Sequence, residues 1–265
     1  RSEALFLTPK ASSSVMSMRI VLRARVYWKY KEFQTIMSAI ASNLQAVRAR
    51  IAIAASAAGR RPDEVELLAV SKTWPVDCII DAARAGQRAF GENYVQEGVD
   101  KVLAAANLDL TWHFIGPLQS NKTRPVAEHF AWVHTLERLR IAERLSAQRP
   151  ASLPALQVCV QVNISGEASK SGCAPEEALA LCRAVANLPR LQLRGLMAIP
   201  EATDDIAGQR AAFRRLRDVY NKARAAGLPL DTLSMGMSHD LEAAVTEGAT
   251  IVRIGTAIFG ERTNA

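Results

Sequence analysis

Short apolar runs recur along the chain and alternate with longer stretches in which apolar residues follow a helical period. Each run has the length of a buried strand and is bounded by polar or glycine-containing turns. The pattern predicts eight strands, at residues 65–70, 88–90, 111–115, 132–134, 155–162, 192–198, 232–234 and 251–254. Helical periods between them predict helices at residues 75–85, 95–106, 136–148, 174–186 and 205–226.

A further helix is predicted before the first strand. Its apolar positions fall at steps of four and three residues and end at Gly59, which supplies a C-terminal stop. These positions are Ile40, Leu44, Val47, Ile51 and Ala54.

Regular alternation of strands and helices with short connections is typical of a parallel sheet, and eight such units favour closure into a barrel. The length of 265 residues suits one barrel, and neither an internal repeat nor an interdomain linker divides the chain. We therefore predict a single-domain α/β fold, a (β/α)8 TIM barrel over residues 37–265. An open doubly wound sheet is the alternative.

The first 36 residues differ in composition from the rest. They hold seven basic groups against two acidic ones, which accounts for +5 of the net charge of +7. This basic extension fits a targeting segment, a disordered tail or non-native sequence upstream of Met37. The remaining residues carry only +2 and show no basic stripe, so nucleic acid is not expected as a partner.

Other composition features narrow the class of protein. No run reaches the roughly 18 apolar residues that a membrane span needs, so no membrane partner is expected. The four cysteines form no CxxC pair and show no metal-ligand spacing with histidine. We interpret them as free thiols in a reducing compartment, so we expect no metal site and a cytoplasmic location. From the compact barrel we expect a monomer.

Lys72 is the most informative candidate for chemistry, because it follows a buried strand at the end where an α/β barrel places its active site. Lysine is seldom buried without a partner or a function. Its amine can form a Schiff base with an aldehyde cofactor if its pKa is lowered. The alternative is a lysine that extends to solvent from the barrel rim.

Two glycine-containing turns near the C-terminus predict an anion site. Gly236 and Gly255 let the backbone approach a ligand, while Ser234, Ser238 and Thr256 offer hydroxyls. Barrels often bind phosphate with the loops after strands seven and eight, and a helix expected near residues 238–240 could add amide donors. A serine helix cap and an ordinary glycine turn are the alternative.

Arg253 lies in the eighth predicted strand. Beside a pyridine nitrogen, its permanent charge would disfavour protonation of that nitrogen and weaken the ring as an electron sink. The alternative is a salt-bridged arginine at the rim. His113 is interpreted as a structural residue, and Asn93 as a residue that either orients a ring or satisfies loop backbone.

At these residues the chain resembles the pyridoxal phosphate homeostasis protein family, which is related to the barrel domain of alanine racemase. Ordered motifs from about Met37 to Arg262 carry the resemblance: LLAVSKTWP (67–75), FGENYVQEGVDK (90–101), WHFIGPLQSNK (112–122), VNISGEASKSG (162–172), RGLMAIP (194–200) and SMGMSHDLEAAVTEGATIVRIGTAIFGER (234–262). The basic extension departs from the family pattern.

The resemblance implies that pyridoxal 5′-phosphate (PLP) is the cofactor and that Lys72 is its Schiff-base lysine. Asn93 would lie beside the cofactor, and Arg253 would face its pyridine nitrogen. The phosphate would be held by Ser234 and Ser238 with Gly255 and Thr256, although which serine contacts it directly stays open.

Two functions compete. A racemase needs a base on each face of the substrate carbanion, and Lys72 can serve on only one face. Related racemases obtain a tyrosine base from a second domain, which is not expected here, and only Tyr94 is expected near the mouth. We therefore favour a non-enzymatic PLP-binding protein of intracellular PLP homeostasis, with PLP-dependent apo-enzymes as possible recipients. A sugar-phosphate enzyme that uses Lys72 on its substrate is a third alternative.

Overall fold

The computed structural model describes residues 39–167 and 170–261. Residues 40–265 belong to one compact unit, which holds the whole fold described below. The predicted basic extension at residues 1–36 lies outside the described residues.

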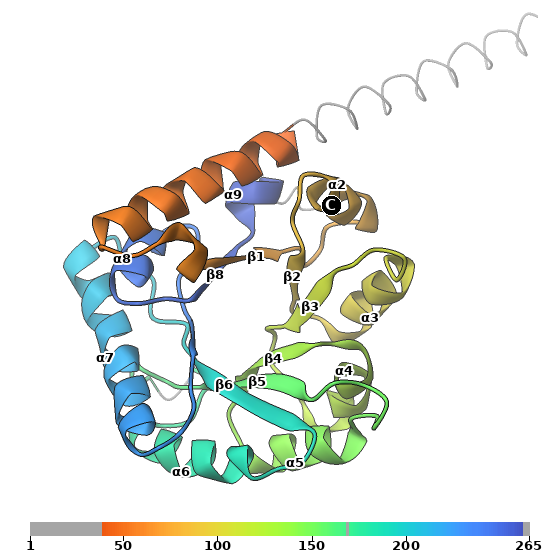
Figure 1. The fold of residues 1–265 in the computed structure, drawn as a ribbon, viewed down its shortest axis with the longest axis vertical. Coiled ribbons are helices and arrows are strands. Elements are labelled where there is room, and N and C mark those ends of the chain that lie inside the picture. The colour runs from red at the N-terminus through yellow and green to blue at the C-terminus, as the bar shows by residue number, and fades with distance from the viewer. Residues whose placement is uncertain (1–38, 168–169, 262–265) are drawn as a thin grey trace, which may run out of the picture. The chain divides into compact units, whose positions relative to one another are not determined.

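The compact unit is a closed barrel of parallel strands that pair in chain order from β1 to β8, with β8 back on β1 (Figure 1). The (β/α)8 barrel is thus confirmed, and the open sheet is excluded. The strands are β1 (Glu66–Val70), β2 (Ala89–Glu92), β3 (Thr111–Phe114), β4 (Trp132–Leu136), β5 (Leu156–Gln161), β6 (Leu191–Met197), β7 (Thr232–Ser234) and β8 (Ile251–Ile254).

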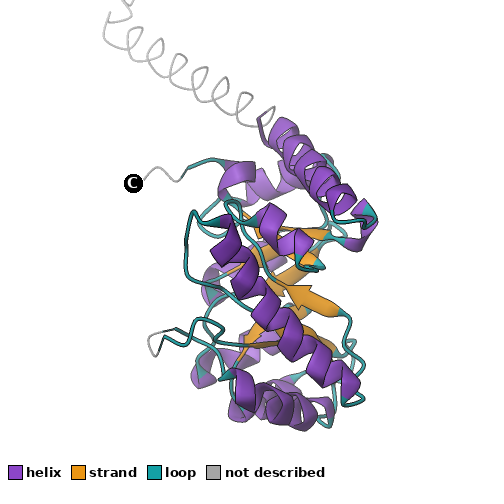
Figure 2. Cartoon of the chain, turned by 90° about the vertical axis from the view of Figure 1, so that its left-hand side faces the viewer, coloured by secondary structure: helices purple, strands orange, loops and turns teal. Residues whose placement is uncertain are grey.

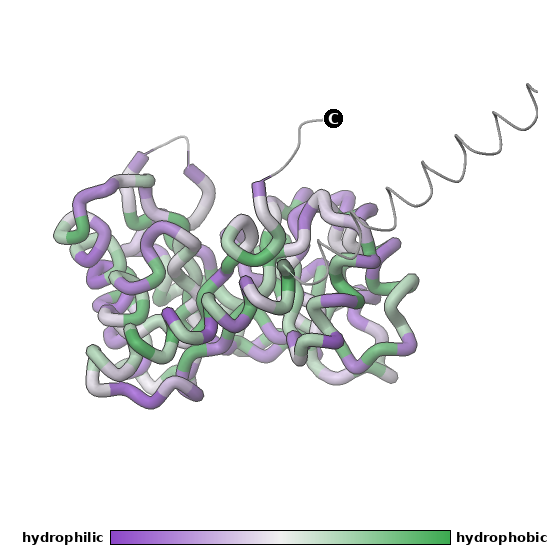
Figure 3. Tube along the Cα trace, turned by 90° about the horizontal axis from the view of Figure 1, so that it is seen from above, coloured by the Kyte–Doolittle hydropathy of each residue, from purple (hydrophilic) through white to green (hydrophobic). Residues whose placement is uncertain are grey.

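A helix follows each strand, and these helices form an outer layer around the barrel (Figure 2). Hydrophobic and hydrophilic positions alternate along them, as expected for helices with one face on the strands (Figure 3). They are α2 (Val76–Arg84), α3 (Val95–Ala104), α4 (Thr123–His129), α5 (Leu139–Gln148), α6 (Pro175–Ala186), α7 (Ile206–Ala225), α8 (Leu241–Thr246) and α9 (Thr256–Phe259), with short 3-10 turns η1 (Pro62–Glu64) and η2 (Ser120–Lys122). Among the described residues, no helix has the length and apolar character to cross a membrane.

The predicted first helix is present over residues 40–57 within this unit. All five of its predicted apolar positions, from Ile40 to Ala54, are buried. The helix ends just before Gly59, whose φ of 69° is a left-handed conformation that glycine adopts readily.

Two strands extend two residues past their predicted ends: β2 runs to Glu92 and β4 to Leu136, while the other strand bounds differ by at most one residue. Leu136 was assigned to the following helix, but it belongs to β4 and pairs with Val160. The β4–β5 register shifts between Val133 and Leu136, so β4 continues past an irregularity that the sequence pattern did not mark.

The barrel interior has an apolar part. Leu68, Ala89, Ile115 and Ile251 form a small buried cluster contributed by β1, β2, β8 and the residue that follows β3. It is distinct from the large cluster of buried residues that includes the apolar faces of the helices. Strand β8 contributes Ile251 to this cluster and also carries the buried Arg253.

A close approach of strands β6 and β7 requires Gly195. A Cβ atom built there would lie 1.7 Å from the Thr232 carbonyl oxygen. The pairing of Gly195 with Thr232 therefore requires a residue without a side chain at position 195.

We predict that Gly195→Ala lowers the free energy of unfolding by about 3 kcal/mol, because overpacking in a core forces backbone shifts. Urea denaturation followed by circular dichroism measures the change. The control is Gln192→Ala at an exposed position of the same strand, which should stay within about 0.5 kcal/mol of wild type. Equal stabilities for the two variants would contradict the prediction.

Candidate functional site

The predicted site residues lie on a continuous arc of the barrel formed by β7, β8, β1 and β2. Lys72 follows β1 and is half-buried, while Asn93 directly follows β2. A Cβ atom on Gly255, after β8, would lie 3.2 Å from the carbonyl oxygen of Val70, so this turn packs against the end of β1. The carboxyl ends of neighbouring strands thus bring the predicted residues to one end of the barrel.

A buried chain of hydrogen bonds crosses the barrel interior from Arg253. Its Nη1 donates to Ser234 Oγ over 2.8 Å, and its Nη2 donates to the Ala198 carbonyl oxygen over 2.9 Å. Ser234 Oγ also lies 2.7 Å from His134 Nδ1, and His134 Nε2 lies 2.9 Å from His113 Nδ1. Because β4 and β7 are not neighbours in the barrel, the bond between His134 and Ser234 must pass through the interior.

Burial keeps both histidines neutral. Desolvation lowers the pKa of His113 to about 3 and also lowers that of His134, to which the nearby charge of Arg253 contributes. Burial lowers the pKa of Arg253 to about 10, and the Asp240 carboxylate opposes that shift. The guanidinium therefore stays charged at neutral pH, and the two acceptors of its side-chain hydrogen bonds are neutral.

The turn after β7 is shaped for a close backbone approach. Gly236 has a φ of 96°, and a Cβ atom there would lie 2.5 Å from the Ala244 Cβ. Its carbonyl accepts the Arg253 backbone N–H, which ties this turn to β8. Ser238 is half-buried, and its carbonyl accepts from Arg50.

The helix expected near residues 238–240 begins at Leu241, after the Asp240 cap. The Asp240 side chain accepts the Met237 backbone N–H, so it occupies one of the donors of this turn. With six residues, α8 is too short for its N-terminus alone to explain anion binding. Gly255 instead precedes α9, and Thr256 is exposed at its start.

Asn93 has an unpaired acceptor. Its buried Oδ1 has no hydrogen-bond partner among the residues that the structure describes. Its backbone is packed tightly, because a Cβ atom on Gly116 would lie 1.9 Å from the Asn93 carbonyl oxygen. A buried amide oxygen without a partner is costly, which is typical of an atom that a ligand satisfies.

Sequence reasoning missed His134, which links Ser234 to His113. Its signal was the spacing Trp132-Val133-His134, since alternate residues of a strand share one face. His113 was predicted to be structural, and it is fully buried and stacked on Trp132 with ring centroids 5.2 Å apart. Its Nε2 has no partner among the described residues.

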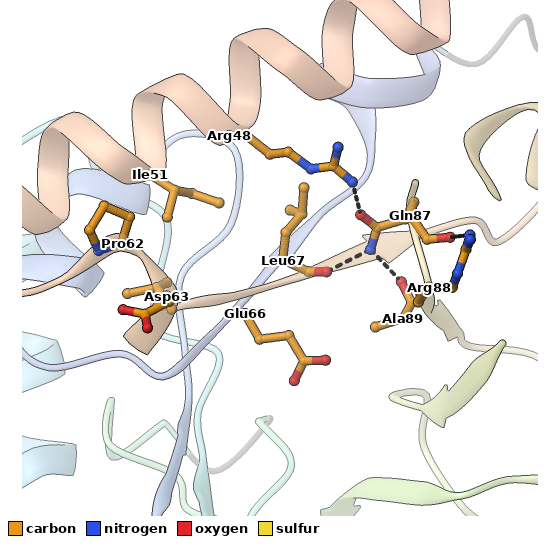
Figure 4. A pocket seen from close by; sticks show the side chains of 10 residues that line it. Arg48, Ile51, Pro62, Asp63, Glu66, Leu67, Gln87, Arg88 and Ala89 are labelled. Carbon is orange, nitrogen blue, oxygen red and sulfur yellow. Dashed lines mark hydrogen bonds between the residues drawn. The ribbon is translucent and has the colours of Figure 1, made fainter. Parts of the chain in front are cut away.

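A cavity of about 420 Å³ lies at the opposite, N-terminal end of β1 and β2 (Figure 4). Its polar groups already serve the fold. Gln87 donates to the carbonyls of Leu67 and Ala89, and Arg48 donates to Gln87 and to Ala85. In barrels of this type the chemistry lies at the carboxyl ends of the strands, so we place the candidate site there.

The donor set at the carboxyl ends suits an anionic aldehyde with an aromatic nitrogen. It offers a lysine amine, a glycine turn with hydroxyls, a buried guanidinium and an unpaired amide oxygen. Within residues 39–167 and 170–261, no cluster of three or more histidine, cysteine or acidic side chains could hold a metal ion. All four cysteines lie in these ranges and are buried without a disulfide.

The fold and this site define a parallel α/β barrel with a lysine at the end of its first strand. Residues 42–263 match the family model of the alanine racemase N-terminal domain. The chain belongs to this family and, within it, to the pyridoxal phosphate homeostasis proteins.

This assignment is supported by relatives that the chain matches over nearly their whole length. The pyridoxal phosphate homeostasis protein of Pseudomonas aeruginosa is 64% identical over 226 residues, which cover 85% of this chain and 97% of that protein. The one from Escherichia coli K12 is 56% identical over 229 residues, covering 85% and 98%. The structure of PipY from Synechococcus elongatus with PLP bound superposes with a TM-score of 0.73 at 39% identity, covering 83% of this chain and all of that one.

Because the two histidines are buried, we predict that the free energy of unfolding depends on pH. An unfolded histidine has a pKa near 6.5, so between about pH 6.5 and pH 3 the unfolded state binds more protons than folded His113. Stability therefore falls as the pH drops through this window. Between pH 7 and pH 5, His113→Asn should lose about 2 kcal/mol less of its unfolding free energy than wild type.

Urea denaturation at both pH values tests this prediction. The control is His239→Asn, because His239 is exposed and should leave the wild-type pH dependence intact. A wild-type pH dependence in His113→Asn would show that His113 does not titrate as a buried neutral group.

Proposed function

We propose that this protein binds PLP as a Schiff base on Lys72 and serves in intracellular PLP homeostasis. The observation that carries the proposal is the meeting of Lys72, the Gly255 turn and the buried Arg253 at the ends of adjacent strands. The names of its relatives, and the PLP in the PipY structure, support the same cofactor. In this role the protein buffers the reactive aldehyde and passes it to PLP-dependent apo-enzymes.

Ser238, Gly255 and Thr256 are the proposed phosphate ligands. Of the two serines left open by the sequence, Ser238 is the better candidate. The Ser234 hydroxyl is buried between Arg253 and His134 and serves to orient the guanidinium. Asn93 would offer its unpaired Oδ1 to a donor on the cofactor.

Arg253 favours a carrier over a catalyst. PLP supplies an electron sink in enzymes when its ring nitrogen is protonated, and an acidic partner promotes that protonation. A guanidinium can only donate hydrogen bonds, and Arg253 is held in place through both terminal nitrogens. This arrangement would keep the nitrogen unprotonated and the bound cofactor unreactive.

A racemase remains the second candidate, because one tyrosine lies near the mouth. Tyr94 follows Asn93 and is 55% exposed. Tyr220 is committed to the outer layer, where its hydroxyl donates to the Leu230 carbonyl. Tyr27 and Tyr30 lie outside the described residues.

We predict that the purified protein binds added PLP with a visible absorption band that Lys72→Ala abolishes, because the substitution removes the amine that forms the Schiff base. Lys222→Ala, at an exposed position of α7, is the matched control and should keep the band. A wild type that gains no band with PLP would overturn the proposal and favour a sugar-phosphate enzyme.

We also predict that the PLP-loaded protein exchanges the Cα proton of L-alanine with deuterated solvent no faster than free PLP does. Nuclear magnetic resonance measures the exchange, and its rate should not exceed that with free PLP because Arg253 damps the electron sink. Rapid exchange that Tyr94→Phe removes would instead establish a racemase with Tyr94 as its second base.

A further inference from the structure

The turn that carries Lys72 has an unusual backbone. Thr73, the next residue, has a φ of 68°. A left-handed conformation is sparsely populated for a β-branched residue, so other contacts must hold it in place. Such a turn determines the direction in which the Lys72 side chain leaves the strand.

Both neighbours of Lys72 are held by side chains of the next βα unit. Ser71 Oγ donates to Glu92 Oε1 of β2 over 2.6 Å. The Thr73 backbone N–H donates to Glu97 Oε1 of α3 over 2.5 Å. The turn is therefore restrained on each side of the lysine by a carboxylate.

Lys101 of α3 joins these restraints. Its Nζ lies 2.7 Å from the Ser71 carbonyl oxygen, 2.8 Å from Glu92 Oε1 and 2.6 Å from Glu97 Oε1. An ammonium has three N–H donors, and these three acceptors use all of them. We call Lys101, Glu92 and Glu97 the latch.

Stability alone is a weak explanation for the latch, because two of its members are buried charges. Lys101 is 6% exposed and Glu92 is fully buried. Burial raises the pKa of Glu92, while the charge of Lys101 opposes that shift. A buried ion pair often contributes no more stability than apolar residues of the same size, and its best attested use is to fix one arrangement.

One member of the latch can be changed without emptying the core. The Glu97 side chain is 29% exposed. It lines a cavity of about 570 Å³ outside the barrel together with Thr73, Trp74 and Lys101. A new side chain at position 97 is therefore solvated by water in this cavity.

We propose that Lys101 is a positioning residue that sets the geometry of Lys72 through Ser71, Glu92 and Glu97. Its effect on PLP rests on the proposed function, whereas its effect on the Lys72 amine does not. Loss of the latch frees the turn, so the amine leaves the orientation in which it meets the cofactor. Displacements of about 1 Å at a reacting group reduce rates by up to roughly a hundredfold.

The test compares Lys101→Met and Glu97→Gln with Arg149→Met. Arg149 is also a buried cation that donates to three carbonyls, those of Ala127, Phe130 and Pro154, but it lies away from Lys72. It therefore controls for the general loss of a buried charge. Thermal unfolding followed by circular dichroism establishes that each variant is folded.

Two readouts follow on the folded variants. The first is the rate at which acetic anhydride modifies Lys72 in the cofactor-free protein, measured by peptide mass spectrometry. The second is PLP affinity, measured by absorbance. We expect Lys101→Met to change the modification rate and to lower PLP affinity, each about tenfold. Glu97→Gln should cause smaller changes in the same directions. Arg149→Met should give a modification rate and a PLP affinity near those of wild type.

Wild-type values of both readouts in folded Lys101→Met would overturn the proposal. If Lys101→Met does not fold, Glu97→Gln decides by the same two readouts, with Lys101→Arg as a second variant. Arginine keeps the charge but cannot direct donors to the same three acceptors, so it should restore folding and leave both readouts altered. If the wild type fails to bind PLP, the proposed function fails, while the modification rate still decides the role of Lys101.

Discussion

The buried guanidinium of Arg253 constrains the centre of the barrel. A charge out of contact with water must be hydrogen-bonded and must not face another positive charge. Its neighbours meet both conditions, because Ser234 and the Ala198 carbonyl accept from it and the histidines beyond are kept neutral by burial. If His134 were protonated, Ser234 would have a positive charge on each side, His134 on one and Arg253 on the other.

This constraint divides the interior of the barrel. Strands β1, β2 and β8 contribute the apolar cluster that contains Leu68, Ala89 and Ile251. The chain of polar groups that starts at Arg253 of β8 is continued by β7, β4 and β3. Lys72 follows the strand between β2 and β8, so it borders both the apolar cluster and the strand that carries the buried charge.

The sequence predicts the barrel well because its strands are short apolar runs with clear boundaries, and β7 and β8 have the predicted bounds. It fails at Leu136, where a register shift extends β4. It also fails at His134, because alternation along a strand indicates the face on which a residue lies but not its partner on a strand across the barrel. Glu97 and Lys101 are four residues apart, a spacing typical of exposed helix pairs, so the burial of Lys101 against Glu92 of β2 depends on tertiary structure.

The barrel itself does not decide between carrier and racemase, since one fold supports many functions. The decision rests on what surrounds Lys72. Two buried cations lie close to its strand: Arg253 on β8, which pairs with β1, and Lys101 on α3, which is bonded to the Ser71 carbonyl and to Glu92 of β2. The two cations act differently. Lys101 is neutralised by two carboxylates and fixes a backbone, whereas Arg253 is bonded to neutral acceptors and keeps its charge available to a ligand. Under the proposed function, a site built in this way would hold an aromatic aldehyde rather than activate it.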